Sequence, residues 1–303
     1  MRFNFLKNLG LLLLPLATFA SNAEVAMVII EDADKDNYSS AIKTCTDYKI
    51  EYDPITIPKD GYKDNIENLF YNNVDGKLQP KYTVLVFPNG RVSYKNGKTW
   101  KSAITDEQWL QIEGYARTND ARLVFLNEYP STATGTKLYK ECSGESDCKF
   151  DLTHKVIADK NIVLAETVNE VNLVVDKNIY HVPAAIDTNI QGKDNVSIEP
   201  VMYFSPAEPD YPENTVAAVT VNKNGAKLIA FYMAFGNWSK ESSALNVVWL
   251  SWATGKDLKH LNGGSIDSND ALKDAASGDI KSVNLEVIFV GITTFFTIIA
   301  ALL

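Results

Sequence analysis

Val25-Ala-Met-Val-Ile-Ile30 is an unbroken run of apolar residues, and Tyr82-Thr-Val-Leu-Val-Phe87 and Arg122-Leu-Val-Phe-Leu-Asn127 repeat this pattern further along the chain. Continuous apolar runs of this length are typical of strands that are buried on both faces of a sheet. Helical patterns lie between them, at about Tyr38 to Tyr48 and after a capping box at Thr105-Asp-Glu-Gln108. This order of strands and helices predicts a parallel sheet with helices on both sides.

The middle of the chain has a different pattern. From Cys148 to Ala218 short alternating segments replace the helical periodicity, and Asn224-Gly225 predicts a hairpin turn between the last of them and the strand that follows. A strand at 228–234 and a helix from Glu241 to Thr254, with Ser239 as its N-cap, then resume the first pattern. Other expected segments are extended at 49–57, 161–165, 171–175, 197–204 and 215–221, and weakly helical at 64–71. The whole indicates an α/β domain of the flavodoxin or amidotransferase type, with an inserted antiparallel β region.

The beginning of the chain has the layout of a cleavable secretion signal. Basic Arg2 and Lys7 precede an apolar segment, Leu9 to Phe19, and small residues follow at Ser21-Asn22-Ala23. We therefore expect residues 1–23 to be removed.

The end of the chain resembles the signal that is exchanged for a glycolipid anchor. Small residues around Ser277 are followed by a polar spacer and a charge-free apolar tail, Val287 to Leu303. Ser277 is the expected attachment residue, and a C-terminal tail anchor or a freely secreted form are the alternatives. The expected parts are a signal peptide (1–23), an α/β domain (24–147 and 227–255), a β-rich insertion (148–226), a linker (256–277) and an anchor propeptide (278–303).

Composition restricts the partners. Hydrophobic residues make up 46% and charged residues 22% of the chain, as in globular proteins, and the formal net charge is −9 without a basic run. Nucleic acid is excluded as a partner on this basis, because binding it requires clustered Lys and Arg. Sequons at Asn37, Asn195 and Asn237 predict glycosylation and agree with display at the plasma membrane or cell wall.

The chain has three cysteines. Cys142 and Cys148 bracket a short polar loop and are expected to form a disulfide in an oxidising compartment. Cys45 lies on the apolar face of the first predicted helix, where a buried structural thiol is the simplest interpretation.

No catalytic motif is recognisable. The three histidines, His154, His181 and His260, have no ligand-type spacing, and we predict neither a metal nor a cofactor. Asp32, with Asp34 and Asp36, follows the first strand and resembles half of a calcium loop, but carboxylates also suit the start of a helix. In parallel sheets, ligands bind beyond the carboxyl ends of the strands, so this loop is a candidate binding site.

Aromatic and amide side chains near strand ends are the other candidates. Sugars stack on flat aromatic faces and form hydrogen bonds with carboxylates and amides. These candidates are Tyr94, Trp100, Asn127, Glu128, Tyr129, Tyr203, Tyr211 and Trp238. Each has a structural role as its alternative, and Trp109, Trp249 and Trp252 have the helical spacing of core residues.

Several phrases resemble one family. These are Val84-Leu-Val-Phe-Pro-Asn-Gly-Arg-Val-Ser-Tyr94, Arg122-Leu-Val-Phe-Leu-Asn-Glu-Tyr-Pro-Ser131 and Phe231-Tyr-Met-Ala-Phe-Gly-Asn-Trp-Ser239, and they are similar to the N-terminal half of the secreted fungal polysaccharide deacetylases that act on galactosaminogalactan. In that family this region precedes the catalytic domain and is associated with carbohydrate binding. The paired Asp and the metal histidines of the catalytic domain have no counterpart in this sequence, so the resemblance implies no catalytic residue.

The expected function is therefore a non-enzymatic carbohydrate-binding protein, attached to the outer leaflet through its lipid anchor. Its partner would be a galactosamine- or glucosamine-containing polysaccharide, and its net negative charge favours a polymer with free amines. The alternatives are a glycan-modifying hydrolase or its relic, with Asp32 and Glu128 as the pair to test, and a structural adhesion protein.

Overall fold

The computed structural model describes residues 23–97, 99–140, 152–207 and 211–258. The secretion signal up to residue 22, Cys142, Cys148, His260 and the anchor signal with Ser277 lie outside these residues, as does most of the expected linker. Among the described helices, none combines the length and the hydropathy required to cross a bilayer.

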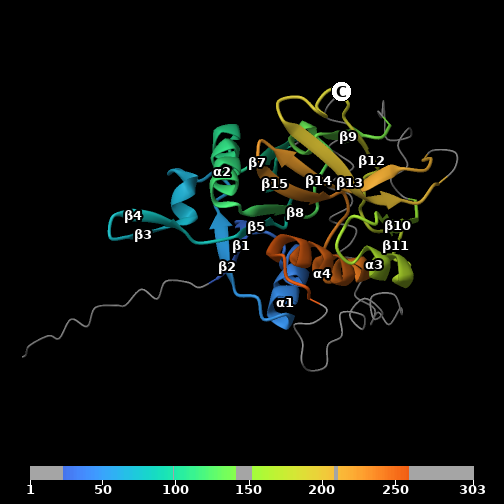
Figure 1. Cartoon of the computed structure of the whole chain (residues 1–303), viewed down its shortest axis with the longest axis horizontal. Coiled ribbons are helices and arrows are strands. Elements are labelled where there is room, and N and C mark those ends of the chain that lie inside the picture. Colours follow the sequence, from blue (N-terminus) through green and yellow to red (C-terminus); the bar gives the residue numbers. More distant parts are fainter. Residues whose placement is uncertain (1–22, 98, 141–151, 208–210, 259–303) are drawn as a thin grey trace, which may run out of the picture.

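The described strands form one eleven-stranded mixed sheet and two separate hairpins (Figure 1). The parallel half of the sheet has the order β15 (Ala226–Phe231), β8 (Arg122–Phe125), β5 (Val84–Phe87), β1 (Val25–Ile30) and β2 (Tyr52–Ile57). The antiparallel half continues from β15 through β14 (Thr215–Lys223), β13 (Val196–Phe204), β10 (His154–Ala158) and β11 (Val174–Val175). The remaining strands are β9 (Thr136–Leu138), β12 (Ala184–Ile186), and the hairpins β3 (Tyr71–Val74) with β4 (Lys77–Pro80) and β6 (Ser93–Asn96) with β7 (Thr99–Ser102).

Helices cover both faces of the sheet, so the predicted fold class is confirmed. On one face α1 (Ser39–Asp47), α3 (Ala165–Val171) and α4 (Lys240–Thr254) share a hydrophobic core, and α2 (Asp106–Asn119) packs into a second core on the other face (Figure 1). Short 3-10 turns are η1 (Lys35–Asn37), η2 (Ile66–Leu69) and η3 (Thr132–Thr134).

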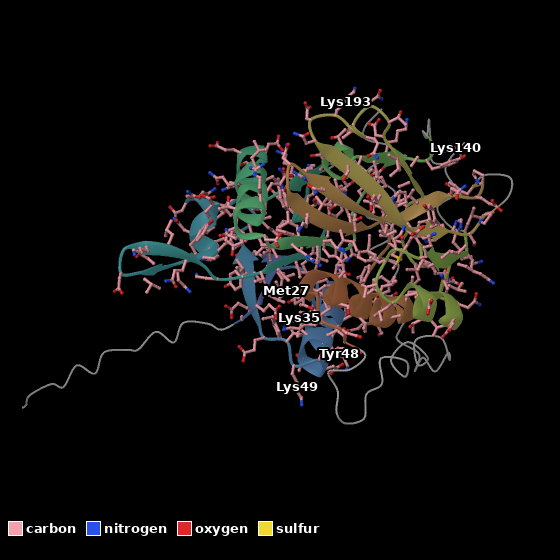
Figure 2. The ribbon with its side chains drawn as sticks, in the orientation of Figure 1. Met27, Lys35, Tyr48, Lys49, Lys140 and Lys193 are labelled. Carbon is pink, nitrogen blue, oxygen red and sulfur yellow. The ribbon has the colours of Figure 1, made fainter. Side chains whose placement is uncertain are left out.

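Strand β1 explains why an unbroken apolar run was necessary. Val25, Met27 and Ile29 belong to the core under α1 and α4, whereas the residues between them belong to the core under α2. Side chains alternate between the two faces of a strand, so a strand covered on both sides has no position for a polar residue. Figure 2 shows Met27 inside the body and Lys49, just beyond α1, at its margin.

Most of the predicted local signals are confirmed. Thr105 and Gln108 form the reciprocal capping box of α2, and Ser239 accepts a hydrogen bond at the start of α4. Asn224 and Gly225 have positive φ angles of 52° and 97° in the hairpin turn between β14 and β15. Strand β15 pairs with β14 on one side and with β8 on the other, so the antiparallel strands of the insertion extend the parallel sheet and do not form a sheet of their own.

Three local predictions were wrong. Residues 161–165 are not extended, because 161–164 form a turn and Ala165 is the first residue of α3. Val171 ends this helix, so β11 begins only at Val174. The expected helix at 64–71 is the single 3-10 turn η2. Helix α3 has seven residues and left-handed residues at both caps, Leu164 and Asn172. A helix of two turns is too short to produce a recognisable 3.6-residue periodicity.

Cys45 is buried on α1, as predicted. Burial is the main cause that raises the pKa of its thiol to about 12, so the thiol remains protonated at neutral pH.

Candidate functional site

Four loops follow the carboxyl ends of β1, β5, β8 and β15, at one edge of the sheet. We call this edge the loop edge and define it by residues 31–38, 88–92, 126–131 and 232–239. Tyr203 of β13 lies beside it, because Tyr203 pairs with Val216 of β14, two residues beyond the pairing of Ala218 with Phe231. The topology thus brings five separate segments of the sequence to one place.

Asn127 connects three of these segments. Its amide group donates hydrogen bonds to the carbonyl oxygens of Pro88 (2.7 Å) and Phe235 (3.4 Å), and its carbonyl oxygen accepts one from the N–H of Phe235 (2.7 Å). Its backbone is left-handed, with φ of 56°, a conformation that Asn tolerates better than most residues. The predicted ligand-binding side chain is therefore engaged in holding the loops after β5, β8 and β15 together.

Glu128 is buried directly beside this connection, with 3% of its surface exposed. Among the described residues, its Oε2 atom has no hydrogen-bond partner. A Cβ atom at Gly90 would lie 3.0 Å from this oxygen and 3.1 Å from the carbonyl oxygen of Asn127. Gly90 also has a positive φ of 56°, so the close approach of the two loops requires glycine at this position.

The carboxyl group of Glu128 is a weak acid in this environment. Burial raises its pKa to about 7, although Arg91 and the N–H of Tyr129 act in the opposite direction. Tyr180 is a further neighbour of this carboxyl group. Burial raises the pKa of the Tyr180 hydroxyl, and the nearby charges of Tyr129 and Glu128 raise it further. A buried carboxyl group with a pKa near neutrality is a feature of functional sites, and also of some structural ones.

Two more buried oxygens belong to the same loops. Asn89 Oδ1 and Ser131 Oγ have no hydrogen-bond partner within the described part of the chain. Buried polar atoms in proteins are nearly always paired, so these three acceptors are able to receive hydrogen bonds from a water molecule or a ligand group.

The loop after β1 is acidic and touches the loop after β15. Asn237 donates its backbone N–H to the carbonyl oxygen of Asp36 (3.1 Å). A Cβ atom at Gly236 would lie 2.4 Å from Trp238 Nε1 and 2.7 Å from the same Asp36 oxygen. The half-buried ring of Trp238 therefore lies next to the acidic loop.

Four carboxylates in the acidic loop are exposed, at Glu31, Asp32, Asp34 and Asp36. Asp32 forms an ion pair of 3.2 Å with Lys59, and Asp34 accepts a hydrogen bond from the N–H of Asp36 at the start of η1. No three His, Cys, Asp or Glu side chains converge as a metal site within the described ranges.

The structure brings some of the predicted residues together and separates others. Tyr129 is 38% exposed at the loop edge, next to Glu128. Tyr94 pairs with Lys101 and Trp100 pairs with Lys95 in the β6–β7 hairpin, so Tyr94 and Trp100 point to opposite faces of it. Tyr211 is buried, with 1% exposed.

Two of the histidines form a buried cluster in the antiparallel half. The rings of His154 and His181 lie 5.2 Å apart, and Phe204 packs against both. Burial lowers the pKa of both imidazoles, to about 4 in His181. Both are therefore neutral at neutral pH.

Gly90, Arg91 and Tyr180 were not among the predicted site residues. Gly90 and Arg91 directly follow a predicted buried strand, so the rule that ligands bind at carboxyl ends of strands would have found them. Tyr180 carries no such signal, because it reaches the site from a connection inside the antiparallel half.

Comparison with known proteins identifies a family. The profile of the family described as Agd3 CBM87 matches residues 24–252. The crystal structure of Agd3, described as a novel carbohydrate deacetylase, is similar with a TM-score of 0.59 and 21% identity over 77% of this chain. This similarity supports a shared fold, and the chain spans only 32% of the length of that protein.

Two other solved structures are more distant. A glutamine amidotransferase from Thermotoga maritima has a TM-score of 0.35 and 9% identity, covering 90% of this chain and 96% of its own. A putative ThuA-like protein from Bacteroides uniformis has a TM-score of 0.34 and 11% identity, covering 86% and 91%. No curated protein sequence matches the chain.

The buried carboxyl group predicts a specific dependence of stability on pH. Glu128 has a pKa of about 7 in the folded state, against an ordinary value of 4.5. The stabilisation of the folded state by the protonated carboxyl group is therefore complete below pH 4.5 and is lost as the pH rises through 7. The loss is on the order of 3 kcal/mol in the free energy of unfolding. Glu128→Gln, which resembles the protonated acid, should remove this loss, as measured by chemical denaturation across the pH range.

Glu199→Gln, at an exposed position of β13, is the matched control, and it should leave the pH dependence of the wild type unchanged. If Glu128→Gln loses stability with rising pH as steeply as the wild type, the assignment of this pKa to Glu128 is wrong.

Proposed function

This chain belongs to the carbohydrate-binding family of the Agd3 CBM87 domain, and on that basis we propose that it is a non-enzymatic carbohydrate-binding protein of the cell surface. The family match over residues 24–252 is the observation that carries the proposal. The match covers every described strand of the sheet and all but the last two residues of α4, so the scaffold of the module is present in this chain.

The loop edge is the proposed binding surface. Tyr129 and Trp238 offer aromatic faces there, and sugar rings stack on such faces through their C–H groups. Asn127 fixes the loops that carry both residues, so the surface is rigid before a ligand arrives. A preorganised surface binds without the entropic cost of ordering loops.

The proposed ligand is a polysaccharide of galactosamine or glucosamine that carries free amines. Near neutral pH such a polymer is cationic, whereas the chain has a net charge of −9 and four exposed carboxylates in the loop after β1. Lys35 and Lys59 only partly compensate these carboxylates. The charge distribution therefore favours a cationic polymer at this edge.

The double variant Asp32→Asn/Asp36→Asn tests this electrostatic contribution. We expect roughly three- to tenfold weaker binding of a deacetylated galactosamine polymer at low salt, because each exposed ion pair contributes about 0.2–1 kcal/mol. High salt should weaken the wild type and reduce the difference. Calorimetric titration of the purified chain measures both effects.

Asp75→Asn/Asp194→Asn is the matched control, because it changes the net charge equally at exposed positions away from the loop edge. Equal weakening by both double variants, or binding that is indifferent to salt, would contradict a local role of the acidic loop.

A hydrolase is the second candidate function, and Glu128 is the observation that favours it. A buried carboxyl group with a pKa of about 7 could act as a general acid or base. The proposed partner, Asp32, is exposed and paired with Lys59. We expect the purified chain to release neither acetate nor reducing ends from N-acetylated galactosamine polymer. Release that Glu128→Gln abolishes would replace the binding function by a hydrolytic one.

We further propose that the mature chain is secreted, glycosylated and held at the outer leaflet by a glycolipid anchor at Ser277. The charged-then-apolar start and the small residues before the apolar end support this proposal. Asn195 and Asn237 are exposed and Asn37 is half-buried, so the first two sequons are the more accessible.

Phospholipase C specific for phosphatidylinositol is expected to release the chain from intact cells. Deletion of residues 278–303 should give a freely secreted form, which serves as the control. A chain that resists the enzyme, or one found in the cytosol, is inconsistent with the anchor.

A further inference from the structure

A second concave region lies at the other end of β8 from Glu128. It is a hollow of about 470 Å³, within the range of small-molecule sites. Its lining comes from the start of β8, from the turn before α3 and from the end of α4, and includes Arg122, Asn161, Leu164, Trp252, Lys256 and Asp257. Glu128 comes six positions after Arg122, which corresponds to about 20 Å of extended chain. One sugar ring cannot contact both sites.

The hollow combines an aromatic ring with polar groups. The guanidinium of Arg122 lies 5.0 Å from the ring centroid of Trp252 and donates a hydrogen bond to the backbone carbonyl of the same residue. The cation–π contact holds the half-buried indole ring, and the hydrogen bond holds the backbone of the same residue. A guanidinium has five N–H donors, and this hydrogen bond uses one of them.

The rim adds amide and carboxylate groups. Asn161 and Asp257 are exposed at the mouth of the hollow, whereas Leu164 is buried and contributes an apolar wall. An apolar surface surrounded by a few donors and acceptors matches a pyranose ring, which has C–H patches on its faces and hydroxyl groups around its edge.

The charge of the hollow differs from that of the loop edge. Arg122 and Lys256 are cationic and Asp257 is anionic, and Lys256 is neutralised by an ion pair with Glu24. The hollow therefore lacks the excess of carboxylates that would attract an ammonium group.

We infer that this hollow is a second sugar subsite, which binds an uncharged pyranose such as a hexose or an N-acetylated hexosamine. The inference rests on the proposed carbohydrate-binding function but not on the location of its first site. A polymer that is only partly deacetylated carries both kinds of unit. The loop edge would bind its cationic units and the hollow its neutral ones.

The test compares two kinds of oligosaccharide by calorimetric titration of the full chain. Hexamers of N-acetylglucosamine and N-acetylgalactosamine are neutral, and their deacetylated forms are cationic. Asn161→Ala/Asp257→Ala changes only exposed rim residues and should weaken the binding of a neutral hexamer roughly tenfold, the loss of about two hydrogen bonds. The same variant should bind the cationic hexamers as the wild type does.

Two further variants define the site. Arg122→Lys keeps the charge but loses the planar guanidinium, so it should also weaken neutral hexamers. The control Asp64→Ala/Asn68→Ala removes one exposed carboxylate and one exposed amide elsewhere and should have no effect.

Each outcome is decisive. If neutral hexamers do not bind, or bind the rim variant as tightly as the wild type, the second subsite is refuted, while binding of cationic hexamers preserves the proposed function. If no hexamer of either kind binds, both proposals fail. Weakening of neutral hexamers alone by the rim variant supports the subsite.

Discussion

The hydrogen bonds of the Asn127 side chain are the interaction on which the loop edge depends. A single amide bridges the ends of β5, β8 and β15 by bonding to the backbone of Pro88 and Phe235. Each such bond contributes about 1 kcal/mol to the stability of the folded state. Without the Asn127 amide, the backbone groups that it bonds to would be buried without partners, and this would cost more free energy than the bonds contribute. Glu128 directly follows Asn127, and Trp238 comes three residues after Phe235, whose backbone Asn127 holds. The positions of both residues therefore depend on this connection.

Glycine completes the same arrangement. Gly90 allows the loop after β5 to approach the carboxyl group of Glu128, and Gly236 allows the indole of Trp238 to rest against the backbone of Asp36. The acidic and aromatic parts of the edge are thus brought together by residues without side chains.

The sequence alone predicted the framework well because the framework is determined locally. The apolar run at Val25–Ile30, the capping box at Thr105 and the Asn224-Gly225 turn each carry their own physical signal. Helix α3 was missed because two turns have no clear periodicity. The burial of Glu128 could not be predicted, since it depends on Gly90, which is 38 residues away in the sequence, and on Tyr180, which comes from the antiparallel half. The opposite orientation of Tyr94 and Trp100 likewise depends on the register of a hairpin that alternation alone does not reveal.

Cys45 has a consequence for how this protein matures. Its thiol is enclosed by the core under α1, and its pKa of about 12 leaves almost no thiolate at neutral pH. Thiol–disulfide exchange proceeds through the thiolate, so a thiol in this state cannot attack a bridge elsewhere in the folded chain. If the chain matures in an oxidising compartment, as proposed above, an odd cysteine would be a risk for scrambled pairing, and the burial of Cys45 would remove that risk once α1 had docked on the sheet.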